Sequence, residues 1–363
     1  MTAEHRAALW LAMHEYIGAV RASGLRNLAG SFSGIPKLSI EEIRSAGILQ
    51  ERELKLWTDT RVTEEMLERT EARMELAGIR MVIRSDGEFP ERLKNLRDCP
   101  EWLFVRGHLP PEDLPRAAIV GARGCTDYGK TQAELFGRLL ARQGIPVVSG
   151  LAAGIDSAAH EGVLCENGSA YAVLGNGLNL CYPKSSRNLY QRIPGRGGLI
   201  SEYLPDVPPM HWHFPARNRI ISGLADLVIV IEARKRSGSL ITADLALEQG
   251  RDVFALPGRW DDPLSEGCNR LIRVGAGIIT NPSDILDYFH REAQIPPEKE
   301  RCVFKLAKNE KMVYSAIDSR PRSAEEIIVR SGLSAADCMS ILMDLEMRGL
   351  VQQPDNQYYV RIE

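Results

Sequence analysis

The chain lacks any long apolar run. No stretch of roughly 18 consecutive apolar residues occurs, so the sequence predicts no transmembrane helix and no membrane partner. The first residues mix Glu and His into an apolar run and show no basic-then-apolar signal pattern. The seven cysteines include no Cys-x-x-Cys pair, so the usual zinc and disulfide patterns are absent. We therefore expect free thiols, a cytoplasmic location and no bound metal.

Neither sign of charge dominates. The 45 basic and 48 acidic residues leave a formal net charge of −3. This total neither indicates nor excludes a nucleic acid partner, because a basic stripe can lie within a near-neutral protein. The chain is 44% hydrophobic and 26% charged, as is typical of globular proteins, and its 363 residues suffice for two or three domains.

Three regions differ in pattern. Residues 1–75 carry apolar residues at helical spacing and predict a helical domain of the SAM or helix-hairpin-helix kind. Residues 79–290 alternate short apolar runs with helical segments, which predicts an α/β fold with a mainly parallel sheet. A polar linker is expected at 291–305, followed by three helices and a hairpin at 306–363, the pattern of a winged helix. The expected strands are RMVIR, LFVRG, AAIVG, PVVSG, YAVLG, GLISE, LVIVIEA, VFALPG and GIIT.

Residues 124–131, GCTDYGKT, match the phosphate-binding P-loop pattern. Three residues, 121–123, separate the expected strand from this string, and Asp127 inside the loop would oppose a phosphate. A magnesium partner should be an aspartate that ends an apolar strand, but the nearest candidate is Glu232. We therefore expect Lys130 to lie on a solvated first helical turn, and we keep nucleoside triphosphate hydrolysis as an alternative.

Polar, glycine-rich loops follow four of the expected strands. Ligands of doubly wound sheets bind beyond the carboxyl ends of the strands, and helix N-termini attract anions. Nine basic and four acidic residues lie between 184 and 236, a local charge of +5, which fits a polyanion. Tyr182, Tyr203, Trp212 and Phe214 offer faces for base stacking. The candidate binding residues are Gly121, Arg123, Ser149, Gly150, Lys184, Arg217, Asn218, Arg219, Ser237, Gly238, Ser239 and Thr242.

Other chemistry is weakly indicated. Asp156 and His160 are four residues apart on an expected helix, where capping is a simpler role than catalysis. His211 and His213 lack a nearby third metal ligand, and no G-x-S-x-G elbow occurs. We therefore expect no catalytic residue and no cofactor. For the Arg-Asn-Arg cluster at 217–219, ion pairing with acidic neighbours is the alternative to phosphate binding.

The motifs VGARGCTDYG, SGLAAGIDSAAH, AVLGNGLNLCYP, FPARNRIISGLAD and RSGSLITADLALEQG follow one another in this order. In this respect residues 79–290 resemble the DNA-processing protein A family, also called DprA or Smf. The resemblance implies an extended Rossmann-like core and a cytoplasmic, homodimeric protein that is not an enzyme. It also implies that the chain binds single-stranded DNA and helps to load the recombinase RecA onto it during natural transformation and recombination.

The resemblance also assigns individual residues. Arg123 matches the arginine of the family's Gly-Ser-Arg motif, and Lys184 matches the basic position after Tyr-Pro. Two residues depart from the family pattern, because Ala122 replaces a serine and Ala153 replaces an arginine. We therefore expect lower DNA affinity than in typical relatives. The family pattern requires no lysine at position 130, so the P-loop string is coincidental.

The two end domains and a second enzymatic function remain to be predicted. The expected recognition helix at 334–349 carries Asp337, Asp344 and Glu346 against Arg348 alone, so we expect it to have a packing or protein-contact role rather than to read duplex DNA. The amino-terminal domain binds DNA backbones or serves as a scaffold. A nucleotide phosphoribohydrolase, which shares a related core, is the further enzymatic alternative, although this chain has RSGSLIT instead of a P-G-G-x-G-T loop.

Overall fold

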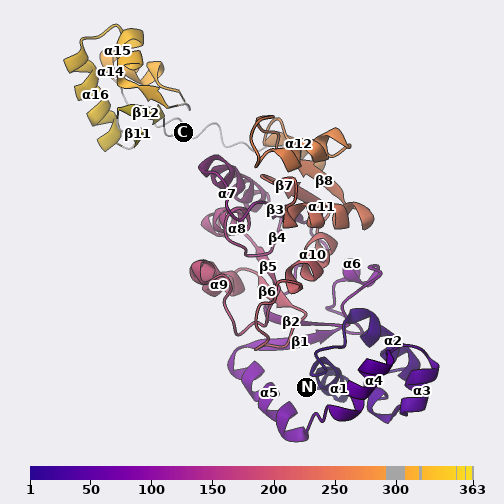
Figure 1. Ribbon diagram of the computed structural model, residues 1–363. Helices are drawn as coiled ribbons and strands as arrows, with labels where there is room; N and C mark the ends of the chain where they lie inside the picture. Colours follow the sequence, from indigo (N-terminus) through magenta and orange to yellow (C-terminus); the bar gives the residue numbers. More distant parts are fainter. Residues whose placement is uncertain (292–306, 319–320, 349, 356, 362–363) are drawn as a thin grey trace. The chain divides into compact units, whose positions relative to one another are not determined.

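The computed structural model describes residues 1–291, 307–318, 321–348, 350–355 and 357–361 (Figure 1). Two compact units are present, Met1–Glu292 and Ala293–Glu363. Apart from residue 291, the predicted linker at 291–305 lies outside the described residues. Among the residues described, no helix is long and apolar enough to span a membrane.

Helices form the first part of the chain, as predicted. Ser39 and Glu42 make a capping box that starts one of them, because each side chain accepts the backbone N–H of the other residue. Leu9, Leu25 and Met74 are buried in the same core cluster as the first two strands of the sheet, so the helices and the sheet share one core. The helices are α1 (Ala3–Ala12), α2 (Ala19–Ala29), η1 (Ile35–Lys37), α3 (Ile40–Ser45), α4 (Glu51–Asp59) and α5 (Glu64–Leu76).

A nine-stranded sheet in the order β1-β2-β6-β5-β4-β3-β7-β8-β9 forms the centre of the first unit. The pairs β1–β2 and β2–β6 are antiparallel, and all other pairs are parallel, which confirms the predicted mainly parallel sheet. The chain order reverses between β3 and β7, which is the topological switch point of a doubly wound sheet. The strands are β1 (Ile79–Ile83), β2 (Trp102–Gly107), β3 (Ala117–Val120), β4 (Val147–Ser149), β5 (Ala170–Leu174), β6 (Gly198–Ser201), β7 (Leu227–Val230), β8 (Asp252–Ala255) and β9 (Gly277–Ile278).

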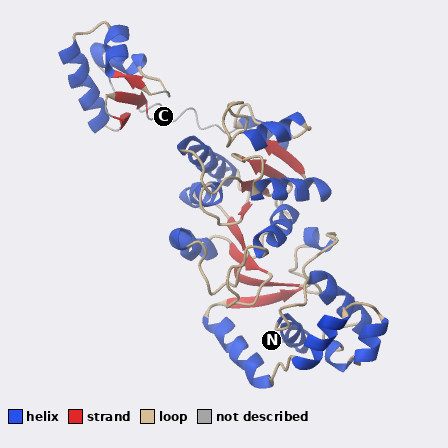
Figure 2. Cartoon of the chain, in the orientation of Figure 1, coloured by secondary structure: helices blue, strands red, loops and turns tan. Residues whose placement is uncertain are grey.

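Helices cover both faces of this sheet (Figures 1 and 2). Ala117 and Ile119 of β3 belong to one buried cluster, and Ala118 and Val120 belong to the other, as the two-residue period of a strand requires. One cluster includes α7 (Asp127–Arg142), α8 (Ile155–Cys165), α9 (Arg187–Arg192) and α13 (Ser283–Tyr288). The other includes α6 (Glu91–Lys94), α10 (His213–Leu224), α11 (Gly238–Glu248) and α12 (Glu266–Arg273). Short 3-10 turns lie at η2 (Lys184–Ser186) and η3 (Ile193–Gly195).

The second unit is a winged helix, as predicted. Ile327, Leu342 and Tyr359 contribute to its own buried core, so this unit has the core that an independent fold needs. Gly332, with φ of 66°, makes the turn between its second and third helices. Its elements are α14 (Lys308–Ala316), β10 (Arg322–Ser323), α15 (Ala324–Ser331), α16 (Ala335–Met347), β11 (Val351–Asp355) and β12 (Tyr358–Arg361).

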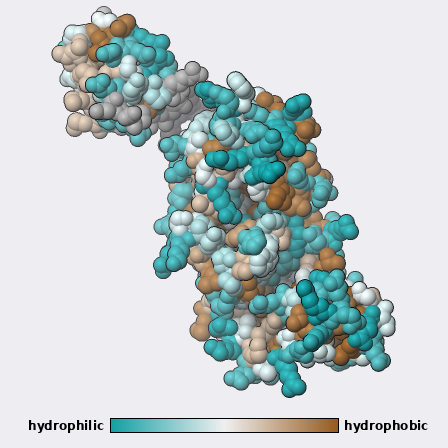
Figure 3. Space-filling model, viewed as in Figure 1, coloured by the Kyte–Doolittle hydropathy of each residue, from teal (hydrophilic) through white to brown (hydrophobic). Residues whose placement is uncertain are grey.

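Hydrophilic side chains dominate the visible surface of the first unit, with hydrophobic ones scattered among them (Figure 3). This distribution is expected when the apolar faces of the helices are turned toward the two core clusters.

Candidate functional site

A pocket of about 630 Å³ lies at the switch point, beyond the carboxyl ends of the parallel strands. Arg123 follows β3, Asp156 begins α8 after β4, and Tyr182 follows β5. The first turn of α11, after β7, closes the pocket with Ser237, Gly238, Ser239 and Thr242. The polar loops that follow four separate strands therefore converge on one site, where a doubly wound sheet binds its ligand.

Two cations stand at the pocket with no carboxylate partner among the described residues. The side chain of Arg123 is exposed, and its Cζ lies 5.1 Å from the ring centroid of Phe214. The ring of Tyr182 lies 5.6 Å from that of Phe214, with an angle of 32° between their planes. Arg236 is exposed and also lines the pocket, directly before Ser237, the N-cap of α11. A guanidinium group beside an aromatic face, as at Arg123, is suited to a phosphate and its neighbouring base.

Arg217 is a buried cation, in contrast to Arg123. Its Nη1 atom donates to the backbone carbonyls of Gly150, at 3.0 Å, and Val173. Burial lowers the pKa of Arg217 to about 10, while the nearby carboxylate of Asp156 raises it and Arg123 lowers it. Arg217 therefore stays charged at neutral pH, but its charge is fixed between strand ends and partly offset by Asp156.

Asp156 is the buried counterpart of Arg217. Its Oδ2 atom accepts the backbone N–H groups of Gly150, at 3.1 Å, and Ala152, at 3.4 Å. Burial raises the pKa of Asp156, and the charge of Arg217 together with these N–H donors opposes that rise. The predicted role of Asp156 in orienting the turn agrees with these bonds. His160 makes no hydrogen bond, so the Asp156–His160 contact that the spacing allowed does not form.

Two of the three glycines of the predicted site, Gly121 and Gly150, have a packing role, whereas a Cβ atom on Gly238 would meet nothing within 4 Å. A Cβ atom on Gly150 would lie 2.6 Å from Nη2 of Arg217 and 2.7 Å from Oδ2 of Asp156. A Cβ atom on Gly121 would lie 2.6 Å from Cγ1 of Ile155. All three distances are shorter than van der Waals contact, so glycine is needed at both positions for α8 to begin close to the ends of β3 and β4.

The N-terminus of α11 supplies hydroxyl and backbone donors. Ser237 caps the helix, because its Oγ accepts the N–H of Ser239 at 3.4 Å, and the two hydroxyl oxygens are 2.7 Å apart. Nδ2 of Asn218 donates to the carbonyl of Gly238 at 3.2 Å, which ties α10 to this turn. Thr242, one turn further, lines the pocket and is buried. The positive end of the helix dipole thus faces the pocket together with two serines.

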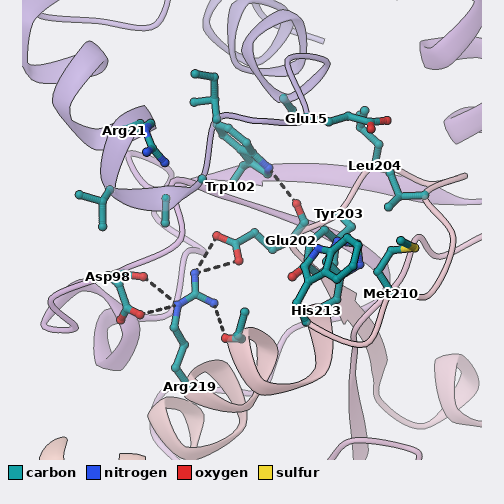
Figure 4. Close-up of a pocket in the computed structure, with 18 of the residues that line it drawn as sticks. Glu15, Arg21, Asp98, Trp102, Glu202, Tyr203, Leu204, Met210, His213 and Arg219 are labelled. Carbon is teal, nitrogen blue, oxygen red and sulfur yellow. Dashed lines mark hydrogen bonds and ion pairs between the residues drawn. The ribbon is translucent and has the colours of Figure 1, made fainter. Parts of the chain in front are cut away.

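Four predicted residues do not line this pocket: Gly150, which packs against Arg217 and Asp156, and Ser149, Lys184 and Arg219. Ser149 is fully buried, and its hydroxyl donates to the carbonyl of Ile119 at 2.6 Å. Lys184 is exposed but does not line the pocket. Arg219 does not line this pocket, because its guanidinium binds Glu202 and lines a different cavity (Figure 4). Its Nη2 atom donates to both carboxylate oxygens of Glu202 at 2.8 Å, so the ion-pair alternative describes Arg219.

Sequence reasoning missed Arg236 as a pocket residue. It lines the pocket beside the capping Ser237, whereas its neighbour Lys235 does not. Its position directly before an expected helix start was the available signal, because a cation there lies beside any anion bound at the helix N-terminus.

A carboxylate of the protein itself binds the backbone within the P-loop string at residues 124–131. Glu232, 4% exposed, accepts the backbone N–H of Thr126 at 2.8 Å and also accepts its hydroxyl. The Thr126 hydroxyl in turn accepts the N–H of Gly129 at 3.0 Å and caps α7. Lys130 is exposed on the first helical turn, as predicted. A carboxylate therefore takes the place that a phosphate would need at this helix N-terminus.

No cluster of three or more His, Cys, Asp or Glu side chains that could hold a metal occurs in the described part of the chain. A doubly wound sheet with a cationic pocket at its switch point, followed by a winged helix, defines a Rossmann-like protein with a carboxyl-terminal winged unit. The family model for DNA recombination-mediator protein A matches residues 80–290, and the model for the DprA winged helix domain matches 297–356. The chain belongs to the DNA recombination-mediator protein A family, which confirms the resemblance found in the sequence.

Relatives and solved structures agree with this assignment. The chain is 39% identical over 278 residues to protein Smf of Escherichia coli K12, covering 74% of each protein. It is 45% identical over 204 residues to DNA processing protein DprA of Streptococcus pneumoniae, covering 56% of this chain and 72% of that protein. The X-ray structure of DprA from Streptococcus pneumoniae matches with a TM-score of 0.68 and 33% identity, over 78% of this chain and 97% of that one. A DNA processing protein A from Helicobacter pylori, described for its single-stranded DNA binding mode, matches with a TM-score of 0.54 and 31% identity, over 59% and 97%.

Proposed function

We propose that the chain binds single-stranded DNA in the switch-point pocket and works by binding rather than by turnover. The observation that carries this proposal is a pair of pocket arginines that have no carboxylate partner among the described residues. Arg123 lies over the ring of Phe214 in the Tyr182–Phe214 pair, and Arg236 stands at the N-terminus of α11. Phosphates would contact the arginines and the helix end, and bases would stack on the rings. The single-stranded DNA binding described for the Helicobacter pylori relative supports the same ligand.

Fluorescence anisotropy of a labelled oligonucleotide, single-stranded against duplex, tests this proposal. Arg123→Ala and Arg236→Ala are the informative variants, because both side chains are exposed and their loss leaves the core intact. We expect tight single-strand binding that weakens with salt and with each substitution. Equal affinity for duplex, or binding that is indifferent to both variants, would reject the pocket.

The enzymatic alternatives predict nucleotide turnover. An NTPase needs a free anion site at residues 124–131, where Glu232 already binds Thr126. A phosphoribohydrolase would release a free base from a nucleoside monophosphate. Incubation of the chain with ATP and with nucleoside monophosphates, followed by chromatography of the products, separates these alternatives from binding alone. We expect both nucleotides to be recovered unchanged.

Further roles rest on family membership. We propose that the chain acts in the cytoplasm as a homodimer, protects single-stranded DNA during transformation and recombination, and helps RecA to assemble on it. Light scattering on the eluting protein measures the dimer. RecA filament formation on a labelled single strand, with and without the chain, measures loading, and an unchanged rate of filament growth would remove this part of the proposal.

The departure at Ala153 gives a prediction about affinity. Ala153 lies in the turn before α8 and is half-buried, beside the pocket residue Ala152. Ala153→Arg adds a cation next to the pocket, so we expect affinity for single strands to rise about threefold to tenfold at low salt. Anisotropy at matched salt checks this, and equal affinity would show that the alanine does not weaken binding.

We propose a protein-contact role for the winged unit. Helix α16 exposes Met343 and Met347, at 61% and 89%, and also exposes Asp337 and Asp344. Acidic side chains on a groove-reading helix would repel phosphates. Substitution of the exposed Ser340 on α16 tests this role. If α16 read the groove of duplex DNA, the added carboxylate of Ser340→Glu would abolish duplex binding. We expect duplex affinity to be unchanged in this variant.

A further inference from the structure

A second pocket, of about 620 Å³, lies between the amino-terminal helices and the sheet unit (Figure 4). Residues 12–21 line one side, and residues 202–219 line the other together with Asp98 and Trp102. This volume is in the range of small-ligand sites, and such sites concentrate where two parts of a fold meet. Nothing in the DNA-binding proposal uses this pocket.

The two pockets share one wall, formed by residues 208–219. Pro209, His211 and Phe214 face the switch-point pocket, whereas Met210 and Trp212 face the second pocket. The charges on the two sides are opposite. Three arginines and one aspartate line the switch-point pocket, a net +2, whereas two arginines and three carboxylates line the second pocket, a net −1. Phosphates are therefore attracted to the first pocket and not to the second.

Most of the charges in the second pocket already have partners. Arg219 binds Glu202 through both carboxylate oxygens and Asp98 at 3.1 Å. Arg21 binds Glu53, which lies outside the pocket, at 2.7 Å. Glu15 is exposed and makes no hydrogen bond or ion pair among the described residues, although its charge opposes the lowering of the His213 pKa by burial, so it is the carboxylate of this pocket that remains open to a ligand.

Aromatic rings stand in the same pocket as Glu15. The rings of Tyr203 and His213 are stacked, with centroids 3.9 Å apart and planes at 25°. Trp212 is 54% exposed and lines the same pocket. Burial lowers the pKa of His213, so its ring stays neutral near pH 7 and does not repel a cation. A free carboxylate among aromatic faces is the chemistry that recognises an ammonium or guanidinium group.

We propose that this second pocket binds an arginine or lysine side chain from a peptide segment of a partner protein. The cationic head would pair with Glu15 and lie against Trp212 and the Tyr203–His213 stack. Val20, 67% exposed, and Leu204 give the pocket an apolar rim that fits a hydrophobic neighbour of the basic residue. This rim, and a volume larger than one side chain fills, favour a peptide over a free amine.

Two labelled heptapeptides test the proposal by fluorescence anisotropy on the full chain. One carries arginine between two leucines, and the other carries glutamate in place of the arginine. We expect the basic peptide to bind, Glu15→Gln and Trp212→Ala to weaken it at least fivefold, and the acidic peptide not to bind. Glu75→Gln is the matched control, because Glu75 is exposed on α5 outside the pocket, and it should leave peptide affinity unchanged.

Three outcomes would overturn the proposal. Equal binding of the acidic peptide, or binding that is unaffected by both Glu15→Gln and Trp212→Ala, would show that the pocket does not recognise a cation. Arginine amide binding as tightly as the peptide would show that the site takes a small amine. Displacement of the peptide by a single-stranded oligonucleotide in an Arg123→Ala, Arg236→Ala variant would show that the pocket takes bases. Glu15→Gln should leave oligonucleotide affinity unchanged, so the failure of this proposal and that of the DNA-binding proposal are distinguishable.

Discussion

Replacing Arg123 by alanine should change both the strength and the salt dependence of single-strand binding. Arg123 and Arg236 are the exposed arginines of the pocket, and the described residues offer no carboxylate to either. Each phosphate contact contributes about −0.7 to the slope of log affinity against log salt for a single strand. Losing one charged hydrogen bond costs about 1.5 kcal/mol, which is roughly tenfold in affinity.

We therefore expect Arg123→Ala to bind roughly tenfold more weakly at about 50 mM salt, with the slope reduced by about 0.7. At about 200 mM salt, the ratio of the two affinities, unsubstituted chain over Arg123→Ala, should be about threefold smaller than at about 50 mM. The reason is that the variant lacks one contact whose formation releases a counterion. Anisotropy titrations at four salt concentrations measure both quantities. Arg69→Ala, an exposed arginine on α5, is the matched control for net charge. An unchanged slope in Arg123→Ala, or an equal change in the control, would refute a phosphate contact at Arg123.

Two further predictions concern stability. The pKa of the fully buried His160 is lowered to about 3 by burial, so its neutral form stabilises the fold above pH 6.5, and that stability is lost as pH falls toward 3. When the pH falls from 7 to 5, the free energy of unfolding of the unsubstituted chain should drop by about 2 kcal/mol more than that of His160→Leu. Urea titrations at both pH values measure this, and an equal drop in the two proteins would count against the prediction. Gly129→Ala places a Cβ 2.4 Å from Cδ of Glu232 and should cost about 1–3 kcal/mol in the same assay, whereas no loss would show that Glu232 moves freely.

All nine expected strands form in the structure, at or within a few residues of their predicted positions. Parallel strands covered on both faces must be apolar on both sides, and this requirement leaves short, near-continuous apolar runs that can be read directly from a sequence. The loops at their carboxyl ends were predictable for the same reason, because the geometry of a parallel sheet brings those ends to one edge. Fold and site location therefore follow from local patterns.

The direction of individual side chains did not follow from such patterns. Arg217 and Arg219 belong to one short motif, and the sequence placed both at the DNA. On α10 they are two residues apart, which is about 200° around a helix of 3.6 residues per turn. They consequently face opposite pockets. The burial of Arg217 could not be predicted from the sequence either. The carbonyl acceptors that allow it to be buried lie on β5 and on the turn after β4, far away in the sequence.

The Arg-Asn-Arg motif at 217–219 ties together the loops around the two pockets. Arg217 donates hydrogen bonds to the carbonyls of Gly150 and Val173. Asn218 donates to the carbonyl of Gly238 at the start of α11, and Arg219 donates to the carboxylate of Glu202. One turn of α10 thus fixes three of the loops that shape the two pockets. Arg217 also balances a buried carboxylate, which makes its loss costly to the fold and not only to binding.

Arg217→Met separates these two roles. Removing one partner of a buried pair costs about 3–5 kcal/mol, so the variant should unfold at much lower urea than the unsubstituted chain. Adding Asp156→Asn removes the uncompensated carboxylate and should recover part of that loss. Because Asp156 already offsets the charge of Arg217, folded Arg217→Met should bind single strands more weakly at every salt concentration while keeping the slope of the unsubstituted chain. A slope reduced as far as in Arg123→Ala would show instead that Arg217 neutralises a phosphate.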